Sequence, residues 1–177
     1  MKLNLGCGNQ IRPGFVGVDR HVCDAAEVLC DLAGRLPFQG DSVEEIWMDN
    51  VIEHVVDTGA LMSEIARVCV AGARVTIRTP HFSSLASYRD PTHVHHLAYS
   101  SMGHFESEAH RHYTGGGFRL VRRHLSFAGG PLGLVGRLVF AISSDVWEKQ
   151  LCFVFRGSTL TFELEVRKSP GSPRAPR

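Results

Sequence analysis

Short apolar segments alternate with polar stretches along the first 80 residues of the chain. The apolar segments lie at residues 2–5, 15–19, 27–32, 44–49 and 73–79, and those before a turn end in Gly, Asp, Asn or Pro. Such short runs are typical of strands buried on both faces of a sheet. Between the last two, residues 59–70 place Leu61, Ile65 and Val68 at helical spacing, with Asp57 or Thr58 as N-cap. This alternation predicts a mostly parallel sheet with helical crossovers.

The second half of the chain continues the pattern less regularly. Residues 117–127 and 159–167 are predicted strands, the latter because Leu160, Phe162, Leu164 and Val166 alternate with polar residues. The apolar, glycine-containing stretch 130–142 is either a helix between them or a surface loop. We expect one domain over residues 1–167 and a disordered, proline-rich tail over 168–177.

A glycine loop between two strands is the most specific motif. Residues 3–19, LNLGCGNQIRPGFVGVD, run from a strand through Gly6 and Gly8 into a second strand that ends on Asp19. Glycines let a ligand approach the main chain closely, and an acid at that strand end can accept hydrogen bonds from ribose hydroxyls. A dinucleotide fingerprint would need a third glycine where Ile11 stands, and no Lys-Ser/Thr pair follows to form a P-loop. An ordinary turn is the alternative.

Further landmarks follow this loop in order. They are Asp31-Leu32, Leu-Pro-Phe at 36–38, Val-Ile-Glu-His at 51–54 and RVCVAGARVTIRTP at 67–80. With the glycine loop, this set resembles class I S-adenosylmethionine-dependent methyltransferases, in particular the small type-11-like group, over roughly residues 3–100. The resemblance implies an α/β fold, Rossmann-like and doubly wound, with a mostly parallel sheet of about seven strands. Because the sequence opens on the first predicted strand, we expect a fold that lacks the N-terminal helices usual in that group.

The resemblance also implies a cofactor site for S-adenosylmethionine. Its residues would follow the carboxyl ends of successive strands: Gly6, Cys7, Gly8, Asp19, Arg20, Asp31, Leu32 and Asn50. The glycine loop would contact the methionine part, Asp19 the ribose, Asp31 with the Leu32 amide the adenine, and Asn50 the sulfonium end. Turn formation by the glycines and helix capping by the acids are the structural alternatives.

Histidines concentrate after the fifth predicted strand: seven of the ten lie between residues 81 and 112. The segment Tyr-Arg-Asp-Pro-Thr-His at 88–93 resembles one that follows the fifth strand in many bacterial methyltransferases near glycan and small-molecule pathways. We expect His81 and His93 to act as general bases or to contact the substrate. Alternatively, His81, Asp90, His93 and His95 would bind a divalent transition metal. His104, His110 and His112 would be surface residues, and His54 is only a reserve candidate.

Composition narrows the class of partner. With 19 basic and 18 acidic residues, the net charge of +1 disfavours nucleic acid and membrane surfaces and favours a small-molecule substrate. Five cysteines without a Cys-x-x-Cys pair favour a reduced, cytoplasmic location. A homodimer, or the segment 81–116, would cover the site.

The function expected from the sequence is therefore methyl transfer to oxygen or nitrogen of a small molecule in a bacterial biosynthetic pathway. The alternatives are a metal-dependent enzyme of other chemistry or a non-catalytic S-adenosylmethionine-binding module on the same fold.

Overall fold

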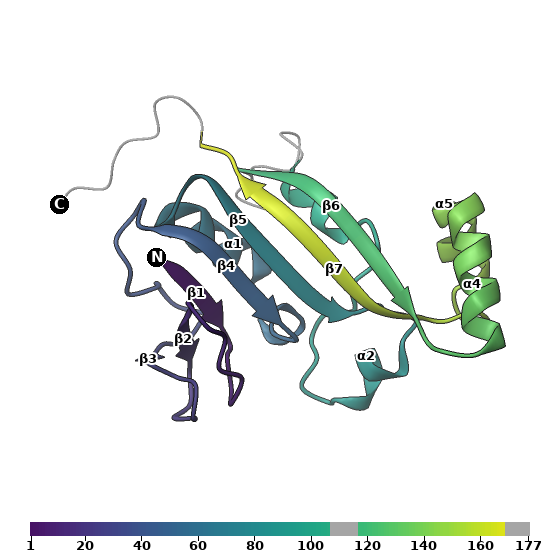
Figure 1. The fold of residues 1–177 in the computed structure, drawn as a ribbon, viewed down its shortest axis with the longest axis horizontal. Helices are drawn as coiled ribbons and strands as arrows, with labels where there is room; N and C mark the ends of the chain where they lie inside the picture. The colour runs from purple at the N-terminus through teal and green to yellow at the C-terminus, as the bar shows by residue number, and fades with distance from the viewer. Residues whose placement is uncertain (107–116, 169–177) are drawn as a thin grey trace.

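A computed structural model describes residues 1–106 and 117–168 and contains one seven-stranded mixed sheet (Figure 1). The strand order is β3-β2-β1-β4-β5-β7-β6. The strands are β1 (Lys2–Leu5), β2 (Val16–Asp19), β3 (Val28–Leu29), β4 (Val43–Asp49), β5 (Cys69–Pro80), β6 (Phe118–Phe127) and β7 (Gly157–Val166). The first five run parallel, and β7 pairs antiparallel with β5 and β6. The expected mostly parallel sheet of seven strands is confirmed. His110, His112 and all of the expected tail except Lys168 lie outside the described residues.

Helical segments follow β4, β5 and β6. They are η1 (Ile52–His54), α1 (Thr58–Val68), α2 (Leu85–Arg89), η2 (Ser101–Phe105), α4 (Pro131–Ile142), α5 (Ser144–Val146) and η4 (Trp147–Leu151). Helix α1 begins where the sequence predicts, because the Asp57 carboxylate accepts a hydrogen bond from the Ala60 amide at 2.8 Å. Its apolar stripe, which includes Leu61 and Ile65, is fully buried in the core. The stretch 130–142, left open between helix and loop, is a helix.

The three crossovers before β4 span residues 6–15, 20–27 and 30–42, all of which the structure describes. They contain no helix, unlike the helical crossovers expected from the sequence. One of them covers the sheet with side chains instead. The Arg12 guanidinium lies 3.7 Å from the Trp47 ring centroid and 4.9 Å from that of Phe15, so its planar group packs over aromatic residues. The carboxyl ends of β1, β2 and β3 are therefore surrounded by loops.

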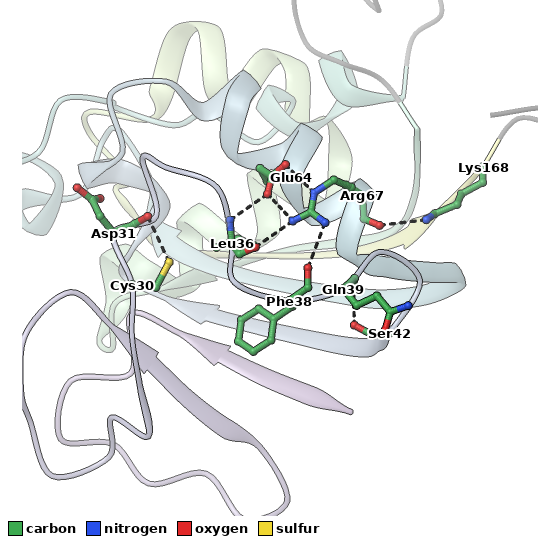
Figure 2. A network of polar contacts seen from close by, with 9 residues as sticks. All are labelled: Cys30, Asp31, Leu36, Phe38, Gln39, Ser42, Glu64, Arg67 and Lys168. Carbon is green, nitrogen blue, oxygen red and sulfur yellow. Dashed lines mark hydrogen bonds and ion pairs between the residues drawn. The ribbon is translucent and has the colours of Figure 1, made fainter. Parts of the chain in front are cut away.

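The loop between β3 and β4 is held against α1 by one ion pair (Figure 2). Glu64 and Arg67 form two charge-assisted hydrogen bonds of 2.8 and 2.7 Å. Arg67 also donates to the carbonyls of Leu36 and Phe38 at 3.0 and 3.1 Å, and Glu64 accepts from the Leu36 amide at 2.9 Å. A bidentate pair with further backbone partners is rigid, so it fixes the loop that begins at Asp31.

Helices α4 and α5 lie beyond the carboxyl end of β6 and the start of β7 (Figure 1). Trp147, which follows α5, is fully buried against Phe127 and Phe140. Leu132 and Leu138 of α4 are exposed. No helix in the described part of the chain is long and apolar enough to cross a membrane.

Candidate functional site

Residues from the ends of four neighbouring strands line one pocket of about 370 Å³. Six of the eight residues expected at the cofactor line it: Gly6, Asp19, Arg20, Asp31, Leu32 and Asn50. Because β3, β2, β1 and β4 lie side by side and parallel, their carboxyl ends meet at one edge of the sheet. The volume lies within the usual range for small-molecule sites. Cys7 and Gly8 are not part of this lining.

Gly6 is required by its position in the pocket wall. Its φ is +64°, and a Cβ there would lie 2.4 Å from Cγ2 of Val51. Any other residue would meet both backbone strain and a clash. The Gly6 amide donates to the Val18 carbonyl at 2.7 Å, which turns the chain sharply over β2 and leaves backbone on the pocket surface.

Asp19 is ordered by backbone amides. Its two carboxylate oxygens accept hydrogen bonds from Gly8 at 2.9 Å and from His21 at 3.0 Å. Burial alone would raise the pKa of Asp19, but amide donors including those of His21 and Gly8 outweigh it and hold the pKa below its ordinary value of 3.8. Each oxygen of an ionised carboxylate can accept a second hydrogen bond, so Asp19 is charged, oriented and able to bind two hydroxyls.

Cys7 is buried and lies outside the pocket lining. Its side chain is 3% exposed, and burial, followed by the neighbouring Cys23, raises the pKa of its thiol to about 11. Cys7, Asp19 and Cys23 place one ligand atom each within 4.8 Å of one another. Because its thiol is buried and neutral, Cys7 contributes to core packing in this structure.

Asp31 and Asn50 complete the rim. The Asp31 carboxylate accepts from the Ala33 amide at 2.9 Å and so fixes the turn after β3. Asn50 has a φ of +56°, a left-handed conformation that asparagine tolerates better than most residues. The backbone amide of Asn50 donates to the Arg78 carbonyl at 2.9 Å. This turn directs the chain from β4 into η1.

A second pocket of about 560 Å³ adjoins the first. Its lining consists of Asn50, His54, Pro80, Ala86, Arg89, Asp90, Pro91 and His93. Asn50 and His54 line both pockets. Two ligands bound in them would therefore meet at these two side chains.

His81 lies apart from both pockets, contrary to its expected role as a base. Its ring is 0% exposed. Nδ1 accepts hydrogen bonds from the amide and the hydroxyl of Ser83 at 3.1 and 2.8 Å, and Nε2 donates to Glu148 Oε1 at 3.0 Å. Both ring nitrogens are used inside the protein, so no lone pair remains for a substrate proton.

The expected metal ligands are not brought together either. Among the described residues, neither group of three or more close metal-ligating side chains contains His81, Asp90 or His95. Asp90 accepts from the Thr92 hydroxyl and amide at 2.6 and 2.9 Å. His95 is half-buried and has its Nε2 3.2 Å from the Val56 carbonyl.

The structure instead joins His93 to Glu53 and His54, each with one ligand atom within 4.8 Å of the others. Glu53 is 1% exposed, and burial raises the pKa of its carboxyl above the ordinary 4.5 despite the Thr79 hydroxyl at 3.0 Å. Glu53 was missed from the sequence and His54 was held only in reserve. The sequence did contain a signal for both residues, because Val-Ile-Glu-His directly follows the carboxyl end of the strand that ends at Asp49.

Comparison with solved structures identifies the fold. An S-adenosylmethionine-dependent methyltransferase from Archaeoglobus fulgidus matches with a TM-score of 0.62 and 18% identity, over 93% of this chain and 85% of that one. Another from Mesorhizobium loti matches with a TM-score of 0.58 and 13% identity, over 93% and 89%. The [4+2]-cyclase SpnF matches with a TM-score of 0.61 and 11% identity, over 95% and 74%.

No protein-family model and no curated relative matches the chain. The expected Rossmann-like fold of class I methyltransferases is confirmed by the solved structures. At these identities the likeness concerns the fold alone, and a cyclase among the matches is a reminder that one fold supports different reactions.

Proposed function

We propose that the protein is an S-adenosylmethionine-dependent methyltransferase that acts on oxygen or nitrogen of a small molecule. The observation that carries this proposal is the meeting of six residues from four strand ends at one pocket of about 370 Å³. Asp19 supplies an ordered carboxylate for the ribose hydroxyls, and Asp31 with Leu32 lies where the adenine edge is expected. Gly6 leaves the main chain open to the methionine part.

S-adenosylmethionine supplies an activated methyl group, so the chain's own task is to hold the acceptor in line and exclude water. The adjoining pocket of about 560 Å³ suits a small acceptor. Its shared wall with the cofactor pocket, at Asn50 and His54, is where the two reactants would meet. His93 contacts the acceptor side as a base or as a metal ligand, and His81 is left out of the chemistry because its nitrogens are occupied.

Binding measured by calorimetry tests the cofactor site. An Asp19→Asn variant keeps the side-chain shape but loses the charge and an acceptor, so its affinity for S-adenosylmethionine should fall about 10- to 100-fold. Asp24→Asn is the matched control, because exposed Asp24 lies five positions further on and outside this pocket lining. Wild-type affinity in a folded Asp19→Asn protein would refute the proposal, as would a wild type that does not bind S-adenosylmethionine.

A second candidate is chemistry without methyl transfer on the same cofactor-binding fold, which the likeness to SpnF favours. The two differ in product. Incubation with small-molecule extracts should convert bound S-adenosylmethionine to S-adenosylhomocysteine and add 14 mass units, roughly one methylene, to the acceptor. Turnover of an acceptor with the cofactor unchanged would favour the second candidate.

We also propose that the reaction belongs to a bacterial biosynthetic pathway, that the protein is cytoplasmic and that it forms a homodimer. Exposed apolar side chains on α4, including Leu132 and Leu138, offer a surface that a second copy could cover. Analytical ultracentrifugation of the purified protein checks the homodimer directly.

A further inference from the structure

We propose that Glu53, His54 and His93 bind a divalent transition-metal ion at the wall between the two pockets. The proposed site goes beyond the proposed function and does not depend on it. It also differs from the ligand set expected from the sequence, of which it keeps only His93. Two imidazoles and one carboxylate are a frequent ligand set for zinc and non-haem iron, with positions left open for water or substrate.

The three side chains are already close enough. One ligand atom from each lies within 4.8 Å of the others, and the two imidazole rings meet edge-on with centroids 4.6 Å apart. Ligands about 2.0–2.2 Å from a shared ion are separated by at most about 4.4 Å. Small side-chain rotations would therefore close the site around an ion.

Glu53 presents an oxygen that lacks a partner. Oε2 accepts a hydrogen bond from the Thr79 hydroxyl at 3.0 Å, whereas the buried Oε1 has no hydrogen-bond partner. Among the described residues, it is the only unpaired buried oxygen of a side chain. Buried polar atoms without partners are rare and unfavourable, and a cation bound at Oε1 would satisfy this one.

Hydrogen bonds orient both histidines with Nε2 as the ligand atom. Nδ1 of His93 lies 2.9 Å from the Ser87 carbonyl, which can only accept, so Nδ1 carries the proton and Nε2 the lone pair. Nδ1 of His54 lies 3.0 Å from the Thr92 hydroxyl, which lies 2.6 Å from Asp90. Since that hydroxyl donates to the carboxylate, it accepts from His54, whose Nε2 again keeps its lone pair.

Backbone contacts hold the two ligand-bearing segments together. The Glu53 carbonyl accepts hydrogen bonds from the amides of Val94 and His95 at 2.9 and 3.1 Å. His93 is thus tied to the segment that contains Glu53 and His54, although about 40 residues separate them in sequence. Histidine ligands whose second nitrogen is fixed by a carbonyl or a carboxylate relay are the usual arrangement in metal sites.

The open side of the ion would face bound molecules. His93 lines the acceptor pocket and His54 lines both pockets. A metal there would bind a hydroxyl or amine of the acceptor and lower its pKa. Only this catalytic role rests on the proposed function; the ligand set stands on the geometry of the three side chains.

Metal titration of the full chain tests the site. After treatment with a chelator, the wild type should bind one equivalent of Zn²⁺ by calorimetry, and Co²⁺ should give the visible absorption of a site with nitrogen and oxygen ligands. His93→Ala and Glu53→Gln should each weaken Zn²⁺ binding at least about 10- to 100-fold. Glu53→Gln preserves side-chain volume, so it reports on the ligand even where the alanine variant folds poorly.

His95→Ala is the matched control, because this neighbouring histidine is half-buried like His93 but lies outside the cluster. It should bind Zn²⁺ as the wild type does. A wild type without a single tight site, or an equal loss in His95→Ala and His93→Ala, would overturn the metal site. Asp19→Asn, by contrast, should lose S-adenosylmethionine and keep Zn²⁺, so failure of the cofactor proposal and failure of the metal proposal are separately visible.

Discussion

Two clusters of glutamate and histidine lie near the end of β5, and they differ in what their polar atoms contact. In the closed cluster, His81 uses both ring nitrogens within the protein, on Ser83 and Glu148, and Glu148 also accepts from the Tyr99 amide at 2.6 Å. The open cluster consists of Glu53, His54 and His93. In it, Glu53 keeps an unpaired oxygen, and His93 has a hydrogen-bond partner among the described residues at Nδ1 only. Both clusters consist of histidine and glutamate side chains.

The difference shows that partners, and not residue type, decide whether a histidine is available for chemistry. A ring whose donor and acceptor are both satisfied inside the core joins segments and stabilises the fold. A ring with one nitrogen fixed and the other directed toward a pocket can bind a proton, a substrate or a metal. The contrast leads to predictions with opposite outcomes for the two clusters.

The largest expected effect is on stability, in the closed cluster. His81→Ala removes a fully buried ring that packs on Phe82 and Trp147 and leaves the Glu148 carboxylate without its side-chain partner. The free energy of unfolding should fall by about 3 kcal/mol, from the cavity and the lost hydrogen bonds together. Urea denaturation measures it.

In the same assay, His95→Ala should change the free energy of unfolding by less than about 1 kcal/mol, because that side chain is only half-buried and has one hydrogen bond among the described residues, from Nε2 to the Val56 carbonyl. His81→Ala should also leave the affinity for Zn²⁺ unchanged. The comparison breaks if His81→Ala retains wild-type stability and loses the metal, because His81 would then belong to the open cluster.

Much of the fold could be predicted from local pattern. The strand that ends on Asp19 and the helix capped by Asp57 begin or end where the sequence indicates, because apolar periodicity and capping act over a few residues. The residues Cys69 and Val70 were expected at the end of the helix but belong to β5, where Cys69 pairs with Val43 across a bulge. That pairing is a tertiary contact, which overrides local preference.

The cofactor side of the candidate site followed from strand order, since each strand end carries its residue to a common edge. The histidine side did not. His81 and Glu148 are 67 positions apart, and His93 meets Glu53 only because the chain folds back onto the Glu53 carbonyl. Such contacts depend on loop conformation, so counting histidines pointed to a segment but could not tell which of its side chains lie close together.

An intermediate effect is expected from the relay behind His54. Thr92→Val keeps the side-chain shape and removes the hydroxyl that connects His54 to Asp90. His54 could then present the wrong tautomer, so the affinity for Zn²⁺ should fall about 10-fold. Thr58→Val is the control, because Thr58 lies at the start of α1 and outside the cluster. Equal affinity in Thr92→Val and the wild type would show that the relay does not orient His54.

The smallest expected effect is on the pH dependence of stability, in the closed cluster. Burial raises the pKa of Glu148, but the hydrogen bonds from His81 and Tyr99 outweigh it and lower the pKa below the ordinary 4.5. A lowered folded-state pKa means that the unfolded chain binds the proton first as the pH falls. The stabilisation is therefore complete above the unfolded-state pKa and is lost as the pH falls through the folded-state value.

The free energy of unfolding of the wild type should exceed that of Glu148→Gln at about pH 6, and the difference should shrink toward about pH 3. Asp145→Asn, an exposed acid paired with Lys149, should show little such convergence. A wild-type advantage that grows on acidification would mean that Glu148 is not held ionised by His81, and the closed cluster would lose its defining feature.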